Sequence, residues 1–397
     1  MLTTHNSQLI SNMTRSKATV MKIPFNQPTV TGREEKYLKQ VIAGKNLSGD
    51  HEFTAQCRQW LEKKFGCQKA LLTTSCTHAL EMAALLAGIR EGDEVIMPSY
   101  TFVSTANPFV LRGAKIIFVD IRPDTLNIDE NLIEDAVTGK TRAIVPMHYG
   151  GVGCEMETIL KIAAEYNVTV IEDAAQAMMA KYKGRYLGTL GQIGAFSFHD
   201  TKNYTCGEGG AVLINDPGLT GQAEILREKG TDRSEFLRGE IDRYTWVDMG
   251  SSYLPSELNA AFLWAQLEMA DEINEQRLKC WQLYREKLKP LQQRGLIELP
   301  TVPQGCEHNG HVFYVKLKDL PTRTRLMDFL RQNGIDCRFH FIPLHSSAAG
   351  KRFGRFHGRD QWTTRESQRM LRLPVYYGIT EAQIGKVCGK VMRFFKG

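Results

Sequence analysis

The sequence predicts an α/β fold, with a large domain around a mostly parallel central sheet and a smaller α+β domain at the C-terminal end. Short β-branched and apolar runs alternate with helical or loop segments from about residue 68 to residue 216, which is typical of a parallel sheet covered on both faces. A long stretch without glycine follows, and a second group of strand and helix patterns comes after it. At 397 residues, the chain also exceeds the size at which one hydrophobic core usually stops growing.

The first group of runs predicts the strands of the large domain. In chain order they are "KALLTT" at 69–74, "DEVIMP" at 93–98, "KIIFVD" at 115–120, "RAIVPMH" at 142–148, "VTVIED" at 168–173, "GAFSFH" at 194–199 and "GAVLIN" at 210–215. Segments such as "THALEMAALLAGI" and "ETILKIAAEYN" lie between them and predict covering helices. Ligands of such a sheet bind at the carboxyl ends of the strands, so residues there are the first candidates for a site.

Residues 256–291 predict a long linking helix with at most one break, because they contain no glycine and no proline before Pro290. Beyond it, "HVFYVKL" and "IDCRFHF" predict strands, and "RTRLMDFLRQNG" and "EAQIGKVCGKVMRFFK" predict helices. We therefore expect a large domain at 23–255 and a small domain at 292–397. Residues 1–22 carry three basic residues, no acid and no apolar centre of a secretory signal, so we expect a disordered or processed tail.

Composition and charge argue against several classes of protein. The chain is 42% hydrophobic and 24% charged, and no apolar run approaches the roughly 18 residues that a membrane helix needs. The formal net charge is +6, and half of it lies in the first 22 residues, so nucleic acid is not an expected partner. The nine cysteines contain no C-x-x-C pair and favour neither a disulfide framework nor a zinc site. We expect a cytoplasmic protein without a metal.

A lysine and an aspartate follow two of the predicted strands. In "GAFSFHDTKN", the period of two places Ser197 and His199 on one face of the strand, and Lys202 comes just past its end. Asp173 ends the strand "VTVIED", and the separation of 202 − 173 = 29 residues leaves room for one crossover between neighbouring strands. We therefore expect the acid and the lysine to lie side by side.

Two further motifs follow predicted strands. In "LLTTSCTHALEMAALL", the strand runs into Ser75, Cys76 and Thr77 and a helix follows, so backbone N–H groups and hydroxyls converge at a helix N-terminus that favours phosphate. In "MPSYTFVSTANPF", Tyr100 and Phe102 supply aromatic faces that would stack on a flat ring.

Phosphate cradle, aromatic plate, carboxylate and lysine together predict a pyridoxal 5′-phosphate (PLP) site. In such a site, lysine holds the cofactor as a Schiff base and an aspartate keeps its ring nitrogen protonated. Each residue also has an ordinary structural interpretation. These are a solvated lysine at 202, helix caps at Asp173, Ser75 and Thr77, and core packing of Phe102 and His199. Their common position at strand ends favours the PLP site.

Five motifs carry a resemblance to a known family. They are "TTSCTHALEMAA", "GDEVIMPSYTFVSTANPFVLRGA", "VIEDAAQA", "SFHDTKNYTCGEGG" and "HFIPLH". In these motifs the chain resembles the sugar aminotransferases of the DegT/DnrJ/EryC1/StrS family over roughly residues 22–397. The resemblance implies the aspartate aminotransferase fold, which is PLP-dependent fold type I.

The resemblance also implies roles for individual residues. Lys202 becomes the Schiff-base lysine, Asp173 the partner of the pyridine nitrogen, and Gln176 a hydrogen-bond partner of the ring's phenolic oxygen. The other implied pocket residues are Phe102 as the stacking plate, Cys76, Thr77 and Ser197 around the phosphate with Ser75 beside them, and His199 in the pocket wall. His345 in "FIPLH" is the candidate that reaches the sugar nucleotide.

One position departs from the family pattern. Many members carry an asparagine that the second subunit offers to the cofactor phosphate, where this chain has Ser252 in "DMGSSYLPSEL". Serine is shorter and supplies a single donor, so Ser252 is a weaker candidate for that contact. Active sites shared between two subunits imply a homodimer.

Within the family, the resemblance is strongest to members that make dTDP-4-amino-4,6-dideoxy-D-galactose, through "MPSYTFVSTAN", "SSYL…AAFLWAQLE" and "FHGRDQWTTRESQRMLRLP". It implies transfer of an amino group from L-glutamate to C4 of dTDP-4-keto-6-deoxy-D-glucose, with 2-oxoglutarate as the second product and pyridoxamine phosphate as the intermediate cofactor form. Three alternatives stay open: an aminotransferase for another nucleotide-linked ketosugar, a relative that removes the sugar 3-hydroxyl, and a non-catalytic regulator that binds PLP or a nucleotide sugar. Relatives of the second kind have histidine at the lysine position, so Lys202 argues against it.

Overall fold

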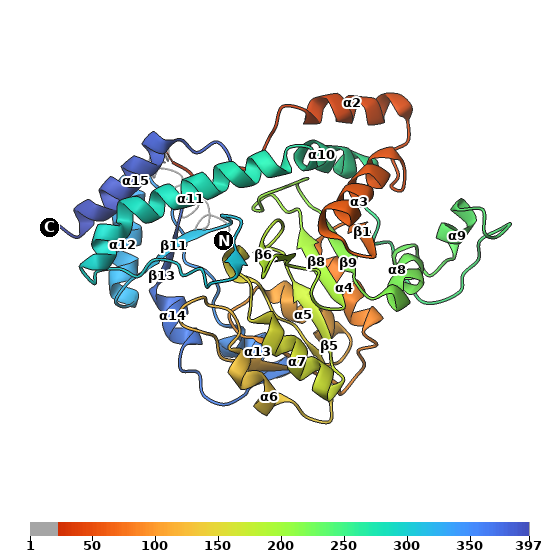
Figure 1. The fold of residues 1–397 in the computed structure, drawn as a ribbon, viewed down its shortest axis with the longest axis horizontal. Coiled ribbons are helices and arrows are strands. Elements are labelled where there is room, and N and C mark those ends of the chain that lie inside the picture. The colour runs from red at the N-terminus through yellow and green to blue at the C-terminus, as the bar shows by residue number, and fades with distance from the viewer. Residues whose placement is uncertain (1–22, 397) are drawn as a thin grey trace, which may run out of the picture.

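An eight-stranded sheet lies at the centre of the computed structural model, which describes residues 23–396 (Figure 1). The tail predicted at 1–22 lies outside the described residues. The strands of the central sheet are β1 (Lys69–Thr73), β2 (Glu94–Pro98), β3 (Lys115–Val119), β4 (Thr141–Ile144), β5 (Thr169–Asp173), β8 (Ile193–Ser197), β9 (Gly210–Ile214) and β12 (Gly354–Phe356).

The strand order is β1-β9-β8-β5-β4-β2-β3-β12, and all seven predicted strand runs take part. β9 runs antiparallel to its neighbours β1 and β8, whereas the remaining neighbours pair in parallel. The prediction of a mostly parallel sheet is confirmed. β12 was not predicted, because three residues are too few to show a periodic pattern.

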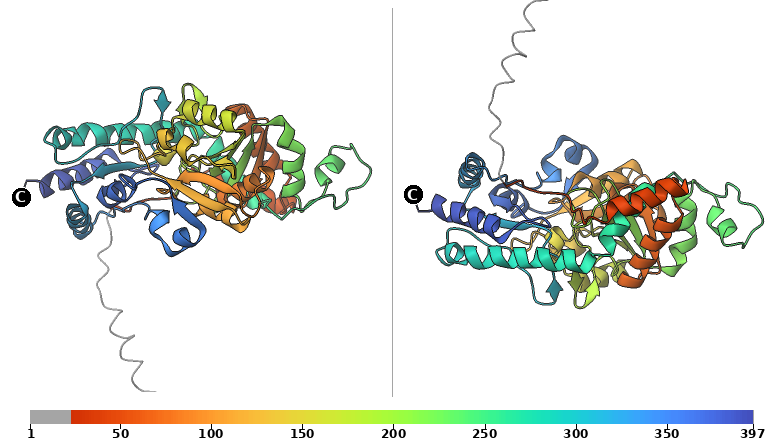
Figure 2. Two further views of the ribbon diagram at one scale, coloured as in Figure 1. Left: turned by 90° about the horizontal axis from the view of Figure 1, so that it is seen from below. Right: turned by 90° about the horizontal axis from the view of Figure 1, so that it is seen from above.

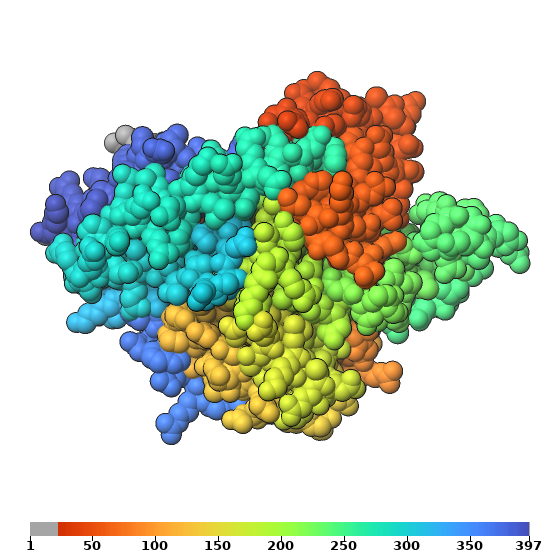
Figure 3. All heavy atoms as spheres, in the orientation of Figure 1, coloured from red at the N-terminus to blue at the C-terminus, as the bar shows by residue number. Residues whose placement is uncertain are grey.

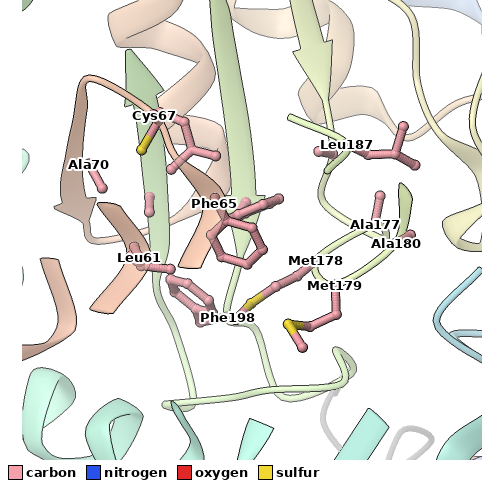
Figure 4. Close-up of a cluster of buried hydrophobic side chains, with 14 of the residues drawn as sticks. Leu61, Phe65, Cys67, Ala70, Ala177, Met178, Met179, Ala180, Leu187 and Phe198 are labelled. Carbon is pink, nitrogen blue, oxygen red and sulfur yellow. The ribbon is translucent and has the colours of Figure 1, made fainter. Parts of the chain in front are cut away.

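Helices cover both faces of the sheet, and the alternation of side chains along each strand divides them between two cores. On β5, Val170 belongs to one core and Ile171 to the other. The first core is covered by α3 (Glu52–Phe65), α7 (Met156–Tyr166) and α10 (Glu257–Leu267), and the second by α4 (Cys76–Leu86), α5 (Val103–Leu111) and α8 (Thr220–Arg227). Figure 4 shows part of the first core, where Phe65 and Phe198 lie among methionine and alanine side chains. By the same alternation, Asp173 and Ser197 lie on the face of the sheet that α4 and α5 cover.

The predicted long helix is two helices. α10 ends at Leu267 and α11 (Ala270–Gln293) begins three residues later, then runs from the central sheet to the C-terminal part of the chain (Figure 1). There α11 packs with α12 (Leu320–Gln332), α15 (Glu381–Phe394) and the antiparallel pair β11 (Phe313–Lys316) and β13 (Met370–Leu373) around a third core. The domain boundaries at 255 and 291 stay a prediction.

The strand predicted at 335–341 is wrong. Ile335 and Arg338 form only isolated bridges, to Ile23 and Arg372. The chain then leaves the extended conformation, because Phe341 has a φ of +29° and Pro343 offers no N–H donor. This segment turns towards the central sheet instead of extending the small one.

The remaining elements are short or peripheral. They are α2 (Glu34–Gly44), α6 (Ile133–Ala136), α9 (Arg233–Leu237), α13 (Ala348–Phe353), α14 (Thr363–Arg369) and the small strands β6 (Lys181–Tyr182), β7 (Arg185–Tyr186) and β10 (Cys306–Glu307). The N-terminus of α14 is tied to the central sheet by Asp120, which follows β3 and accepts hydrogen bonds from the backbone N–H groups of residues 361, 362 and 363. Between residues 23 and 396, no helix is long and apolar enough to cross a bilayer.

A buried carboxylate fixes the end of β5. Glu172 is fully buried and accepts hydrogen bonds from the backbone N–H groups of Gly188, Leu190 and Gly191 at 2.8, 2.6 and 2.7 Å. His148 Nε2 lies 2.9 Å from the same carboxylate. Because Glu172 and Asp173 are adjacent in the strand, they point to opposite faces, and the bonds of Glu172 hold the strand end that carries Asp173.

Replacing Glu172 with glutamine tests this anchor. The amide keeps the shape of the carboxylate but has one acceptor oxygen and places its NH₂ against N–H donors. We expect the variant to lose about 2–4 kcal/mol of unfolding free energy, measured by urea denaturation. Glu165→Gln on the exposed side of α7 is the matched control. Equal unfolding curves for the two variants would contradict this role of Glu172.

Candidate active site

A cavity of about 380 Å³ opens at the carboxyl ends of β5 and β8, beside the N-terminus of α4. Nine of the eleven site residues predicted from the sequence line it. They are Ser75, Cys76, Thr77, Phe102, Asp173, Gln176, Ser197, His199 and Lys202. The other walls come from the N-terminal segment at residues 25–26 and from the C-terminal part of the chain. The site is therefore built from the central sheet with its helices, from the N-terminal segment and from the C-terminal part of the chain.

Lys202 and Asp173 reach the same cavity because β5 and β8 are neighbours. The strands pair in parallel, with Asp173 opposite Ala195. β8 ends at Ser197, and a turn carries Lys202, whose backbone N–H donates to the His199 carbonyl at 2.9 Å. Burial lowers the pKa of the Lys202 amine, while Cys76 and Asp173 oppose this shift. A larger fraction of this amine is therefore neutral and nucleophilic near neutral pH than for an exposed lysine.

Asp173 is held in a fixed orientation. Its Oδ2 accepts a hydrogen bond from the Thr105 hydroxyl at 2.6 Å, and its Oδ1 accepts one from the Ala175 N–H at 3.1 Å. No cationic side chain among residues 23–396 lies within 4 Å of this carboxylate. The residues after it form turns and no helix, so the interpretation as a helix cap is wrong. The buried carboxylate lacks a positively charged partner within the described chain.

The first turn of α4 lines the cavity, as the sequence predicted for residues 75–77. Ser75 caps the helix, because its Oγ accepts a hydrogen bond from the His78 N–H at 3.1 Å. Cys76 and Thr77 follow as the first helical residues, and their N–H groups have no acceptor within the helix. A Cβ on Gly210 of β9 would collide with the backbone of Ser75 and Cys76, so glycine there lets the strand pass directly behind this first turn.

Aromatic and polar groups complete the wall. Phe102 stands at the cap position of α5 and is 57% exposed, so its interpretation as a core residue is wrong. Its ring centroid lies 6.3 Å from that of Phe341. Gln176 accepts a hydrogen bond from the Gly150 N–H through Oε1 at 2.8 Å, which leaves its NH₂ group free to donate. His199 is also partly exposed and contacts Thr201 Oγ1 through Nδ1 at 2.9 Å.

Two predicted residues lie outside the cavity wall. His345 is bound on both ring nitrogens, by Ser99 Oγ at 2.7 Å and by Asp360 Oδ2 at 3.2 Å. Ser252 is exposed at the base of a projecting segment and bridges to Glu228. Neither residue lines the cavity of its own chain.

Sequence reasoning missed the wall from the C-terminal part, which contains His311, His340, Phe341 and Arg372. Burial lowers the pKa values of His311 and His340 well below the ordinary range, so both rings are neutral at neutral pH. His311 Nδ1 lies 2.8 Å from Asn203 Oδ1. Two local signals were present: "HFIPLH" begins with His340 and Phe341, and "MLRL" places an arginine between leucines inside an apolar strand.

Comparisons with known proteins agree over nearly the whole chain. The profile of the DegT/DnrJ/EryC1/StrS aminotransferase family matches residues 28–392. An uncharacterised protein of Methanocaldococcus jannaschii is 35% identical over 352 residues, which cover 86% of this chain and 89% of that protein.

Two solved structures are similar in fold. The aminotransferase TlmJ from Streptoalloteichus hindustanus gives a TM-score of 0.86 at 26% identity and covers 94% of this chain and 99% of its own. S. venezuelae DesV, solved in complex with a ketimine intermediate, gives a TM-score of 0.85 at 26% identity and the same coverage of 94% and 99%. The predicted aminotransferase fold, fold type I, is confirmed.

The pH dependence of labelling at Lys202 tests whether the cavity lowers the pKa of its amine. Because burial lowers its pKa, labelling by an amine reagent should reach half its maximal rate at a lower pH than for an exposed lysine. Lys183 is the control, because its hydrogen bond to Glu157 raises its pKa and should shift its labelling to higher pH. Competitive acetylation followed by peptide mass spectrometry measures both, on protein freed of bound carbonyl compounds with hydroxylamine. A common titration midpoint would contradict the burial of Lys202.

Proposed function

The chain belongs to the DegT/DnrJ/EryC1/StrS aminotransferase family, and from this we propose that it is a PLP-dependent nucleotide-sugar transaminase. The reaction is transfer of the amino group of L-glutamate to C4 of dTDP-4-keto-6-deoxy-D-glucose, which gives dTDP-4-amino-4,6-dideoxy-D-galactose and 2-oxoglutarate. The observation that carries the proposal is that Lys202 and Asp173 face one cavity beside a free helix N-terminus.

The donor set of the cavity fits PLP. The N–H groups at the start of α4, with Ser197 nearby, suit a phosphate. Among residues 23–396, Asp173 has no cationic partner within 4 Å, so it suits a protonated ring nitrogen, while the exposed ring of Phe102 offers a stacking surface. Lys202 would hold the cofactor covalently through its amine.

Bound PLP supplies an electron sink that lets the carbon beside the amino group lose its proton. Lys202, once released as a free amine, takes that proton from the α-carbon of glutamate. In the second half of the reaction it returns a proton to C4 of the sugar, and the face on which it does so decides between galacto and gluco products. The lowered pKa of Lys202 favours the neutral amine that the first step needs.

The choice of sugar is supported by the resemblance in "MPSYTFVSTAN" and in the C-terminal stretch at 356–374. The proposed compartment is the cytoplasm. All nine cysteines lie among the described residues as free thiols, and seven of them are buried, which suits a reducing environment.

A projecting arm, residues 229–252, supports a homodimer with shared active sites. The arm carries α9 and stands away from the body at the end opposite the C-terminus (Figures 2 and 3). Its exposed large apolar side chains are Phe236, Leu237, Tyr244, Trp246, Val247 and Met249, and Trp246 is 80% exposed. Exposed apolar surface of this kind marks an interaction site. Ser252 lies at the base of the arm, where a second subunit would receive it.

Lys202→Ala is the direct test of the catalytic assignment. We expect turnover to fall by about 10³-fold or more, because proton transfer at carbon loses its base. Borohydride reduction and peptide mass spectrometry should find PLP attached at residue 202 in the wild type and at no residue in the variant. Lys161→Ala, on the exposed face of α7, is the control. Normal turnover by Lys202→Ala would refute the assignment.

Substrate specificity has its own test. The protein is incubated with L-glutamate and each of several dTDP- and UDP-linked ketosugars, and the products are identified by NMR. We expect turnover to be fastest with dTDP-4-keto-6-deoxy-D-glucose and the new amine to be axial at C4. An equatorial amine, or preference for a 3-keto sugar, would overturn the proposed substrate or stereochemistry.

Trp246→Lys tests the arm. A large aromatic residue at the centre of an interface typically contributes 2 kcal/mol or more, so the dimer dissociation constant should rise by at least about tenfold. Tyr166→Lys, which replaces an exposed aromatic residue on α7, is the matched control. Sedimentation equilibrium measures both variants. A monomeric wild type, or equal constants for the two variants, would count against the proposed dimer.

A further inference from the structure

Charge is distributed unevenly along the chain. Residues 285–397 contain 21 lysine and arginine residues and nine acidic residues, which gives a net charge of +12. Residues 23–284 contain 26 basic and 35 acidic residues, which gives a net charge of −9. The formal charge of +6 therefore combines two parts of opposite sign with the +3 of residues 1–22. A separation of charge on this scale points to an electrostatic partner of the C-terminal part.

The solvent face of α15 carries much of this positive charge. The buried residues of the helix are Ile384, Val387, Cys388 and Val391. Four cations share the other side, because they follow one another at spacings of four, three and three residues. They are Lys386, Lys390, Arg393 and Lys396. A Cβ at Gly385 or Gly389 would meet no atom beyond the helix itself within 4 Å, so nothing in the described chain covers this face.

The end of α11 adds four cations beside α15. They are Arg285, Lys287, Lys289 and Arg294. The two helices run side by side towards the C-terminus in both views of Figure 2, and Cys280 Sγ of α11 donates to the Ile379 carbonyl, just before α15, at 3.9 Å. Farther along, burial raises the pKa of the Cys388 thiol and Lys287 opposes this shift, so the end of α11 lies next to α15. These eight cations are called the basic end below.

The charges of the basic end are not neutralised within the described chain. Among residues 23–396, none of the eight cations has an acidic oxygen within 4 Å. Glu286 lies between them in sequence and accepts a hydrogen bond from Gln282 at 3.0 Å. Like charges at i, i+3 and i, i+4 destabilise a helix. The helix dipole offsets this for Arg393 in the last turn of α15 but not for Lys386 and Lys390. An anionic partner would turn the repulsion into attraction.

The chemistry of the basic end suits a lipid surface better than a nucleic acid or a second copy of the chain. Among the described residues, no exposed large apolar or aromatic side chain lies in 285–294 or 381–396, so bases find no ring on which to stack. Five of the eight cations are lysines, which act as point charges and lack the fork that reads phosphates and base edges in pairs. A second copy would have to offer its acidic part, and such head-to-tail contacts generate open chains or rings. A bilayer with anionic lipid is a broad plane that requires only cations facing it.

We propose that the basic end binds the surface of a bilayer that contains anionic lipid. The contact is peripheral and needs no segment that spans the membrane. Lipid phosphates lie against the cations of α15 and the end of α11, and salt weakens the attraction because it screens the charges. None of the eight cations lines the cavity, so this binding is independent of the proposed reaction.

Vesicle sedimentation with the full chain tests the proposal. Vesicles of phosphatidylcholine with about one third phosphatidylglycerol are compared with vesicles of phosphatidylcholine alone, at about 50 mM and about 500 mM salt. We expect binding to the anionic vesicles at the lower salt, and at least about tenfold weaker binding to the neutral vesicles or at the higher salt. Each cation near an anionic surface contributes about fivefold to the partition constant, so a triple variant with Lys386→Gln, Lys390→Gln and Arg393→Gln should bind about 100-fold more weakly.

The matched control changes three exposed lysines of the central part, Lys63→Gln, Lys140→Gln and Lys161→Gln. It removes the same charge from the protein and keeps residues 1–22, so we expect its binding to stay within about twofold of the wild type. Equal losses in the two triple variants would show a response to net charge alone and would overturn the proposal. Tighter binding to a DNA duplex than to the anionic vesicles at the same salt would assign the basic end to nucleic acid instead. Self-association without vesicles that salt and the α15 variant both abolish would assign it to a second copy, and either result would also overturn the proposal.

Discussion

The parallel pairing of β5 with β8 is the constraint on which the site depends. It brings the end of one buried strand, with Asp173, beside the turn that follows the other, with Lys202. Neither strand can slip by one residue, because a slip would move every apolar side chain to the opposite core. The hydrogen bonds that Glu172 accepts add a second restraint on the same strand end. Packing of the two cores therefore sets the geometry of the reactive groups.

Burial controls the charges in this cavity. The same removal of water that lowers the pKa of Lys202 keeps two histidines of the wall neutral and leaves Arg372 as a fixed cation. An amine, a carboxylate and a guanidinium thus differ in protonation behaviour although they share one small space. Such a combination suits the proposed reaction, in which an anionic substrate binds and a neutral amine moves a proton.

The sequence predicted those site residues that follow a recognisable apolar run. Lys202, Asp173 and the residues from Ser75 to Thr77 each follow an apolar run, and the end of such a run is visible in the chain itself. Arg372 was missed because its position depends on how the C-terminal part docks against the sheet. The strand expected at 335–341 failed for a related reason, since the alternation of its residues says nothing of the positive φ at Phe341. The packing of distant segments against one another leaves no periodic pattern in the sequence.

Under the proposed function, the order in which a ribosome releases the chain has a consequence for cofactor loading. The lysine, the aspartate and the phosphate cradle all emerge within the first 202 residues, but the wall with Phe341 and Arg372 comes from the last 60. A nascent polypeptide therefore presents its reactive amine to solvent before it can enclose a ligand. Tight capture of a vitamin-derived group must wait until synthesis is complete, so premature termination products would compete poorly for it.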